Sequence, residues 1–224
     1  MPAQITTYAG LKAGVSAWLA RSGDALLDSR FDDFLATCER RLYYGHATDD
    51  PGNPLRSEPL RIVEMETVDD GFVLQAEVAQ PPDFLELISV QLAGPDLPLQ
   101  IVSQRTLDGL GGSGGQGLGG VRLIAVSGTG FRVKDDPAGA TAALRYYRRL
   151  ATPAGAAANE ILALYPDVYL YGCLVEAAIF TQDEAAAQRY LQLYNASVAG
   201  LNARTQRITA SAAPVIRLRA GMLP

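Results

Sequence analysis

Histidine, cysteine and lysine, which often carry catalysis or bind metal ions, are scarce in this sequence. Its 224 residues include one histidine, His46, two cysteines, Cys38 and Cys173, and two lysines, Lys12 and Lys134. Metal sites built on two histidines are therefore excluded, and a Ser-His-Asp triad would have to use His46 beside a proline-rich stretch. The sequence also has no G-x-x-x-x-G-K-S/T motif for binding phosphate. We expect no catalytic residues, no metal and no cofactor, and we do not expect an enzyme.

Long apolar runs are absent as well, although 48% of the residues are hydrophobic. No stretch approaches the roughly 20 apolar residues that cross a bilayer, and "MPAQITTYAG" lacks the basic start and apolar run of a secretory signal. We expect a cytoplasmic protein with no membrane partner. In that reducing compartment Cys38 and Cys173, which both lie in apolar helical patterns, are expected to be buried free thiols rather than a disulfide.

Acidic residues are missing from the end of the chain. The net charge is −5, yet residues 185–224 contain five arginines and no acid. Such an asymmetry indicates either a tail that docks on an acidic partner or a solvated basic terminus with no specific partner. The charge pattern alone does not separate these two interpretations.

The hydrophobic periodicity changes twice along the chain, from a helical period to a period of two and back. Two helical patterns joined by a tight connection predict an N-terminal hairpin, and short alternating segments separated by turn formers predict a small antiparallel sandwich or barrel. A helical hairpin buries little apolar surface by itself, so the helices on both sides of the strands are expected to form one bundle. The expected parts of this α+β fold are the hairpin at 1–50, an inserted β domain at 60–150, further helices at 154–204 and an extended C-terminal arm at 205–224.

Local capping signals give the expected starts of the helices. A capping side chain, or a proline whose missing N–H does no harm in the first turn, occurs where each helical pattern begins. The expected residues are Thr6 or Thr7, Asp28, Asn159, Pro166, and Thr181 or Asp183. The segment that Pro166 starts, "PDVYLYGCLVEAAIF", is unusual because it is apolar or aromatic nearly all the way round.

A glycine-rich stretch, "GLGGSGGQGLGG" at 109–120, formally contains the G-x-G-x-x-G motif of dinucleotide sites. That motif requires a strand before the turn and a helix after it. Here "VRLIAVSG" follows, which is typical of a strand. We therefore predict a flexible loop between two strands, long enough to reach a partner and to become ordered against it.

Two other polar patterns have structural interpretations. Adjacent carboxylates such as Asp32 and Asp33 lie at helix starts, in the linker or in turns, and Glu64 and Glu66 share the outward face of a strand. "RYYRRL" at 145–150 combines cations and aromatic rings as a nucleic-acid surface does, but on a strand these residues alternate between the two faces. A nucleic-acid-binding module that uses such arginine and tyrosine surfaces stays open as the alternative function.

Three segments and the N-terminal hairpin resemble one known family. "TYAGLKAGVSAWL" opens the hairpin, "PPDFLELISV" and "LRYYRRLATP" follow in the β domain, and "YPDVYLYGCLVEAAIFTQDEAAAQRYLQLYNASVAGLNA" covers 165–203. In this order they resemble the adaptor proteins of tailed bacteriophages, also called head-to-tail connector or head-completion proteins. The likeness covers most of the chain, and Pro-Asp-x-Tyr-Leu-Tyr-Gly-x-Leu-x-Glu-Ala-Ala is its most specific motif. The glycine run at 109–120 departs from the family pattern.

The resemblance implies a structural virion protein at the head-tail junction, assembled in the cytoplasm of the bacterial host. It implies a ring, usually a dodecamer, that lies under the portal protein, connects it to the tail tube or nozzle protein and continues the channel for phage DNA. It also implies a C-terminal arm that reaches the portal. The residues expected in this portal-binding arm are Arg207, Ile208, Val215, Ile216, Arg217, Leu218 and Arg219. The residues expected in a loop that faces the tail are Gly112, Gly115 and Gly117.

A ring would explain the apolar segment at 166–180, because one face could pack in the bundle and part of the other against the next subunit. The residues expected at this bundle or subunit interface are Tyr169, Tyr171, Gly172 and Glu176. Gly172 would let another helix approach closely, and Glu176 is an acid on an apolar helix that needs a partner. A hydrolase in the β domain is a third hypothesis, which the scarcity of histidine and metal ligands disfavours.

Overall fold

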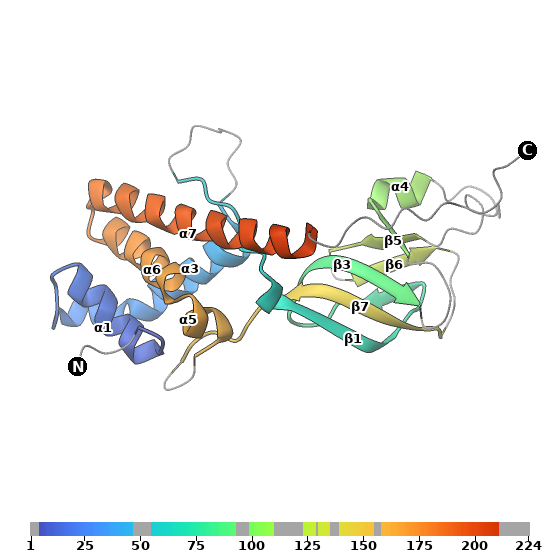
Figure 1. The fold of residues 1–224 in the computed structure, drawn as a ribbon, viewed down its shortest axis with the longest axis horizontal. Coiled ribbons are helices and arrows are strands. Elements are labelled where there is room, and N and C mark those ends of the chain that lie inside the picture. The colour runs from blue at the N-terminus through green and yellow to red at the C-terminus, as the bar shows by residue number, and fades with distance from the viewer. Residues whose placement is uncertain are drawn as a thin grey trace, which may run out of the picture. The chain divides into compact units, whose positions relative to one another are not determined.

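The computed structural model of the chain describes residues 5–46, 55–92, 99–109, 123–128, 130–134, 139–154 and 158–210. These residues form two compact units. One contains the chain up to Val63 and from Thr152 onward and is helical, and the other contains Glu64–Ala151 and holds the strands (Figure 1). The predicted α+β class is therefore confirmed.

One helix, α6, is the centre of the helical unit. The unit consists of α1 (Tyr8–Trp18), α2 (Ala25–Ser29), α3 (Phe31–Tyr44), α5 (Glu160–Leu164), α6 (Pro166–Phe180) and α7 (Glu184–Ala210). α6 packs against α1, α3, α5 and α7 (Figure 1). Because helices of the same chain cover it on several sides, α6 does not need the polar stripe that a surface helix carries.

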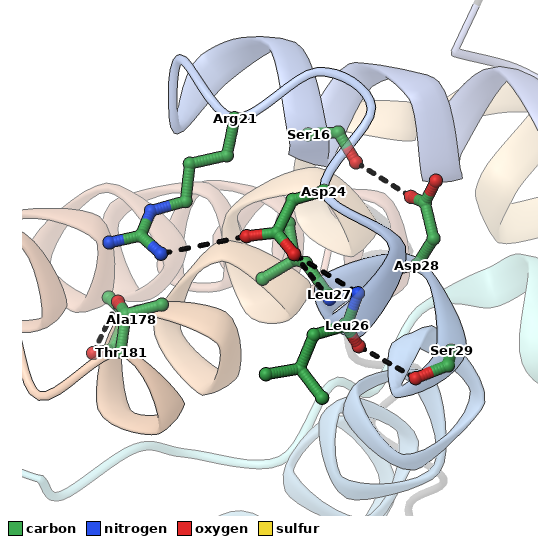
Figure 2. Close-up of polar contacts among 9 residues, drawn as sticks. All are labelled: Ser16, Arg21, Asp24, Leu26, Leu27, Asp28, Ser29, Ala178 and Thr181. Atoms are coloured by element: carbon green, nitrogen blue, oxygen red, sulfur yellow. Dashed lines mark hydrogen bonds and ion pairs between the residues drawn. The ribbon is translucent and has the colours of Figure 1, made fainter.

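The connection between α1 and α3 contains the short helix α2, which the periodicity did not predict. Asp24 caps α2: its carboxylate accepts hydrogen bonds from the backbone N–H groups of Leu26 and Leu27 at 3.0 and 3.3 Å (Figure 2). Asp28, the expected cap of the second helix, lies within α2 and accepts a hydrogen bond from Ser16 Oγ at 3.1 Å. The expectation for Asp28 is therefore wrong, because its carboxylate bonds to a side chain of α1.

The other helix starts agree with the sequence signals. Pro166 occupies the first turn of α6. Thr7, Asn159 and Asp183 each accept a hydrogen bond from a backbone N–H in the first turn of α1, α5 and α7. These determinants lie within three residues of the groups they bind, which is why they can be read from the sequence.

The end of α7 differs from the prediction. The helix continues to Ala210, so the prediction of an extended arm from Thr205 onward is wrong for residues 205–210. Thr205 is buried, and Thr209 Oγ1 donates a hydrogen bond to its carbonyl at 3.0 Å. The helix extends beyond its apolar stripe because no glycine or proline interrupts it there. The remainder of the expected arm, 211–224, lies outside the described residues.

The β unit contains two sheets. Its elements are η1 (Val63–Met65), which begins at the boundary, β1 (Glu66–Val73), β2 (Glu77–Ala79), β3 (Phe84–Leu92), β4 (Gln100–Val102), α4 (Gln104–Gly109), β5 (Leu123–Val126), β6 (Gly130–Lys134) and β7 (Thr141–Arg148). One sheet has the order β1-β7-β3 and is antiparallel. The other has the order β2-β6-β5-β4, in which only the pair β4 and β5 is parallel.

The two sheets share one hydrophobic core. Its buried members are Phe72, Leu74, Val90, Leu92, Leu99, Ile124, Phe131, Val133, Ala142, Leu144 and Tyr146. The Phe131 ring contacts the rings of Phe72 and Phe84 edge-on, at centroid distances of 5.8 and 5.1 Å. The arrangement is a sandwich, so the alternative of a closed barrel is wrong. The helix α4, absent from the expected strand pattern, packs against β5.

Candidate functional site

The apolar helix α6 owes its burial to its own chain. Two of the residues expected at the bundle or subunit interface, Tyr169 and Gly172, are buried within the helical unit. The burial needs no neighbouring copy. The apolar character of α6 is therefore explained by the bundle, and a subunit interface has to be sought among its outward residues.

Gly172 lies where α3 comes close to α6. A Cβ atom at this position would lie 2.4 Å from Cys38 Sγ and 3.4 Å from the ring of Tyr194. Real Cβ atoms essentially never approach another heavy atom so closely. The close approach that the sequence predicts for Gly172 is therefore present, and its partners are α3 and α7.

Cys38 and Cys173 are both fully buried free thiols beside this contact. A hydrogen bond with Cys38 and burial in the bundle core raise the pKa of the Cys173 thiol well above its usual value. A neutral thiol is a poor nucleophile and a poor metal ligand. These cysteines therefore act as small apolar side chains of the core.

Glu176 finds its partner inside the chain. Its Oε1 accepts hydrogen bonds from Arg41 Nε at 3.1 Å and Arg41 Nη2 at 2.7 Å, which joins α6 to α3. The side chains of Arg41 and Glu176 are only 8% and 10% exposed. Arg41 Nη1 also donates to the carbonyl of Leu55 at 3.3 Å. The acid on α6 is thus neutralised without a second subunit.

Tyr169 lies in a second buried network of hydrogen bonds. Its hydroxyl donates to Glu39 Oε1 at 3.0 Å and accepts a hydrogen bond from Asn159 Nδ2 at 2.7 Å. Thr152 Oγ1 donates to the other oxygen of Glu39 at 2.6 Å. Burial raises the pKa of Glu39, and the hydrogen bonds from Thr152 and Tyr169 offset part of that rise. Burial is also the main cause that raises the pKa of Tyr169 far above its usual value.

Several apolar side chains remain on the outside of the helical unit. Tyr171 is half-buried, and its ring contacts the Trp18 ring edge-on at 5.9 Å, while Trp18 itself is 49% exposed. At the end of α6, Ile179 and Phe180 are exposed. A hollow of about 630 Å³ beside them is lined by Leu55, Ile179, Gln182, Glu184, Ala187 and Gln188. Of the expected interface residues, Tyr171 is the one that faces outward.

The arginines and tyrosines of 145–150 are largely engaged within the sheet. Tyr146 is buried, and its hydroxyl donates to Asp83 at 3.0 Å; burial and this contact raise the pKa of Tyr146 to about 12. Arg145 forms an ion pair with Glu66, and Arg149 Nη2 donates to the carbonyl of Pro82 at 2.7 Å. Glu66 thus has a structural role in the sheet. These contacts support the structural interpretation of the segment over a nucleic-acid surface.

The expected portal-binding residues are only partly described. Arg207 and Ile208 lie in the last turns of α7, where both are exposed, Ile208 by 48%. Outside the described residues are Val215, Ile216, Arg217, Leu218 and Arg219 of the arm and Gly112, Gly115 and Gly117 of the glycine-rich loop.

The described side chains do not form a recognisable catalytic or metal-binding site. Among them, no three histidine, cysteine, aspartate or glutamate residues are placed to hold a metal ion. His46 forms a backbone bridge with Ser57 next to the end of α3. None of the described helices combines the length and the apolar character needed to cross a membrane. The helical unit has a well-packed core, and apolar and basic side chains lie on its outside.

Comparison with known proteins gives one family. A search of curated proteins found no match. A family model described as SU10 adaptor protein matches residues 6–218, which is nearly the whole chain and includes both units. The chain therefore belongs to the SU10 adaptor protein family, in agreement with its resemblance to phage head-to-tail adaptors.

Proposed function

We propose that the chain forms a ring under the portal, connects the portal to the tail tube or nozzle protein, and continues the channel for phage DNA. The observation that carries this proposal is the family match over residues 6–218. The buried polar contacts support it, because Glu176 and Tyr169 are satisfied inside one chain. The subunit can therefore fold before assembly.

In this proposal the C-terminal arm binds the portal. Exposed Arg207 and Ile208 begin the portal-binding surface at the end of α7, and Val215, Ile216, Arg217, Leu218 and Arg219 continue it. The two arginines beyond the helix add positive charge in a stretch that has no acid. An arm that becomes ordered on a partner binds only where that partner is present, which enforces the order of assembly.

Deletion of residues 211–224 tests this role more sharply than deletion from 205. The longer deletion would remove buried Thr205 and damage α7, whereas the shorter one leaves every described residue in place. We expect the shortened chain to keep its far-ultraviolet circular dichroism and melting temperature but to lose binding to purified portal rings. A matched variant, with Arg217 and Arg219 changed to glutamine, should show an intermediate, salt-dependent loss. Undiminished binding of the shortened chain would contradict the role of the arm.

We assign the glycine-rich loop at 109–120, including Gly112, Gly115 and Gly117, to the side that receives the tail. The support is its length and composition, which suit a segment that becomes ordered on a partner. Replacing 110–120 by a shorter serine-rich linker between α4 and β5 should leave portal binding unchanged and reduce the attachment of tails to filled heads. Normal tail attachment by this variant would exclude that assignment.

A further inference from the structure

The hollow at the C-terminal end of α6 combines aliphatic and acidic side chains. Ile179 of α6 is 45% exposed beside it, and Ala187 of α7 forms part of its wall. The described residues that line its volume of about 630 Å³ include one acid, Glu184, and no cation. Asp183, directly before Glu184, is also exposed. A segment that fits this hollow therefore presents aliphatic side chains next to positive charge.

One segment of the chain has this character. The sequence "VIRLR" at 215–219 joins three aliphatic residues to two arginines and contains no acid. Its aliphatic side chains match Ile179, and its arginines match Glu184. Gln182 and Gln188 also line the hollow, and each of their amides offers a donor and an acceptor to the backbone of a bound segment.

The segment 215–219 is too short to enter the hollow of its own chain. α7 is one continuous helix from Glu184 to Ala210 (Figure 1). Gln188 therefore lies about 33 Å from Ala210, at a rise of about 1.5 Å per residue. A fully extended chain spans at most about 3.6 Å per residue, so Ile216 reaches no farther than about 22 Å from Ala210. The hollow can hold Ile216 only when this residue comes from another copy of the chain.

We propose that residues 215–219 of one copy bind in the hollow of a second copy when no portal is present. This contact removes exposed Ile179 from water and places two arginines beside an acidic site. Under the proposed function the portal binds the same residues, so the portal and the second copy compete for the arm. The inference concerns the chain without portal and goes beyond the proposed function, so its test is independent of portal binding.

Sedimentation equilibrium of the full-length chain without portal tests the apolar part of this contact. We expect association that increases with protein concentration. The pair Val215→Ser and Ile216→Ser, and separately Ile179→Ser, should each weaken association at least about tenfold, because each removes a buried aliphatic contact. Leu164→Ser is the matched control, because Leu164 is 58% exposed on α5 and does not line the hollow. This control should associate as the parent chain does.

An exchange of charges tests whether the arm and the hollow meet. Glu184→Arg places a cation in the hollow, and Arg217→Glu combined with Arg219→Glu makes the arm acidic. Each of these two variants should associate at least about tenfold more weakly than the parent chain, because like charges then face one another. An equal mixture of the two should associate more strongly than either alone, since the acidic arm of one fits the basic hollow of the other. This test remains valid if Ile179→Ser lowers the stability of the bundle.

The end of the same arm is the competing occupant of the hollow. Met222 and Leu223 lie far enough along the chain to reach the hollow of their own copy. A chain that ends after Arg219 lacks them but keeps the proposed segment, so it should associate as the parent chain does. The proposal is overturned if this shortening abolishes association, or if the parent chain stays monomeric up to about millimolar concentration. It is also overturned if the mixed charge variants associate no better than either alone, or if Leu164→Ser weakens association as much as Ile179→Ser.

Discussion

At the scale of single residues, the contact at Gly172 sets how closely α3 and α6 pack. The position has no room for a Cβ atom, because Cys38 Sγ would lie 2.4 Å from it. Gly200 on α7 is a helical glycine of the same unit with no heavy atom within 4 Å of an added Cβ. Alanine substitution at these two glycines therefore separates the destabilisation caused by crowding from the stabilisation that alanine normally gives a helix.

Alanine should have opposite effects at these two glycines. Gly172→Ala is expected to lower the free energy of unfolding by about 1–3 kcal/mol, the usual cost of overpacking a core. Gly200→Ala should raise it by up to about 1 kcal/mol, because alanine is the better helix former. Urea titration of both variants gives the comparison. Combining Gly172→Ala with Cys38→Ala should recover part of the loss, and an unchanged loss would show that Sγ is not the crowded atom.

Glu39 makes the stability of the helical unit depend on pH. Its pKa is raised in the folded chain by burial, so the proton binds more tightly to the folded than to the unfolded state. The corresponding stabilisation is complete below the unfolded pKa and is lost as the pH rises through the folded pKa. Glu39→Gln, which is neutral at every pH and can keep both hydrogen bonds, should therefore be more stable than the parent chain at pH 7. Thermal melts in a pH series should show this difference in stability disappear towards pH 4. A difference that grows at acidic pH would contradict the predicted direction.

At the scale of elements, the pair Arg41 and Glu176 joins α3 to α6. The two side chains are 135 residues apart in sequence and almost fully buried. A buried pair of this kind contributes little relative to a well-packed apolar pair, but the loss of one partner leaves an uncompensated charge in the core. The pair is therefore tested by comparing the free energy of unfolding of a single variant with that of the double variant.

Single and double replacement of this ion pair should give opposite results. Glu176→Leu is expected to lower the free energy of unfolding by about 3–5 kcal/mol, because Arg41 then stays buried without a counter-charge. Adding Arg41→Met should recover most of that loss, although the bond to the Leu55 carbonyl is missing. Denaturant titration of the two variants decides the point, and a double variant less stable than Glu176→Leu would refute it.

The same scale shows which features the sequence could predict. Helix starts at Thr7, Asn159 and Pro166 depend on groups within one turn, so the sequence predicts them. Glu176 bonds to Arg41 and Tyr169 bonds to Glu39, and each of these partners lies more than 100 residues away in the sequence. Hydrophobic periodicity cannot reveal such distant partners. The C-terminal end of α7 and the short helices α2 and α4 were missed for another reason: each is decided by a few local bonds rather than by an apolar stripe.

At the scale of the whole molecule, assembly has to use what the bundle leaves exposed. Tyr171 and Trp18 form an aromatic pair on the outside of the helical unit, and Ile179, Phe180 and Ile208 are exposed elsewhere on it. A ring requires two different faces of each subunit to complement one another. Of the residues expected at the interface, Tyr171 is therefore the one whose substitution should separate assembly from folding.

A charge at Tyr171 should impair assembly more than stability. Tyr171→Glu is expected to reduce ring formation on the portal at least tenfold while lowering the melting temperature by only a few degrees, as for a partly exposed side chain. Tyr171→Phe, which keeps the ring that contacts Trp18, should assemble normally. Sedimentation with portal and thermal melting give the two readouts. If Tyr171→Glu melts as early as Gly172→Asp, the distinction between interface and core at these neighbouring positions is lost.

The proposal that the chain is a ring-forming adaptor is tested most directly by imaging it on the portal. Purified portal rings of the same phage are mixed with an excess of the full-length chain and averaged along the ring axis by electron microscopy. We predict an added layer at one end of the portal, with rotational symmetry, an open centre and a copy number that can be counted. Portal rings that gain no layer, or that gain one without an open axial channel, would contradict the proposed function.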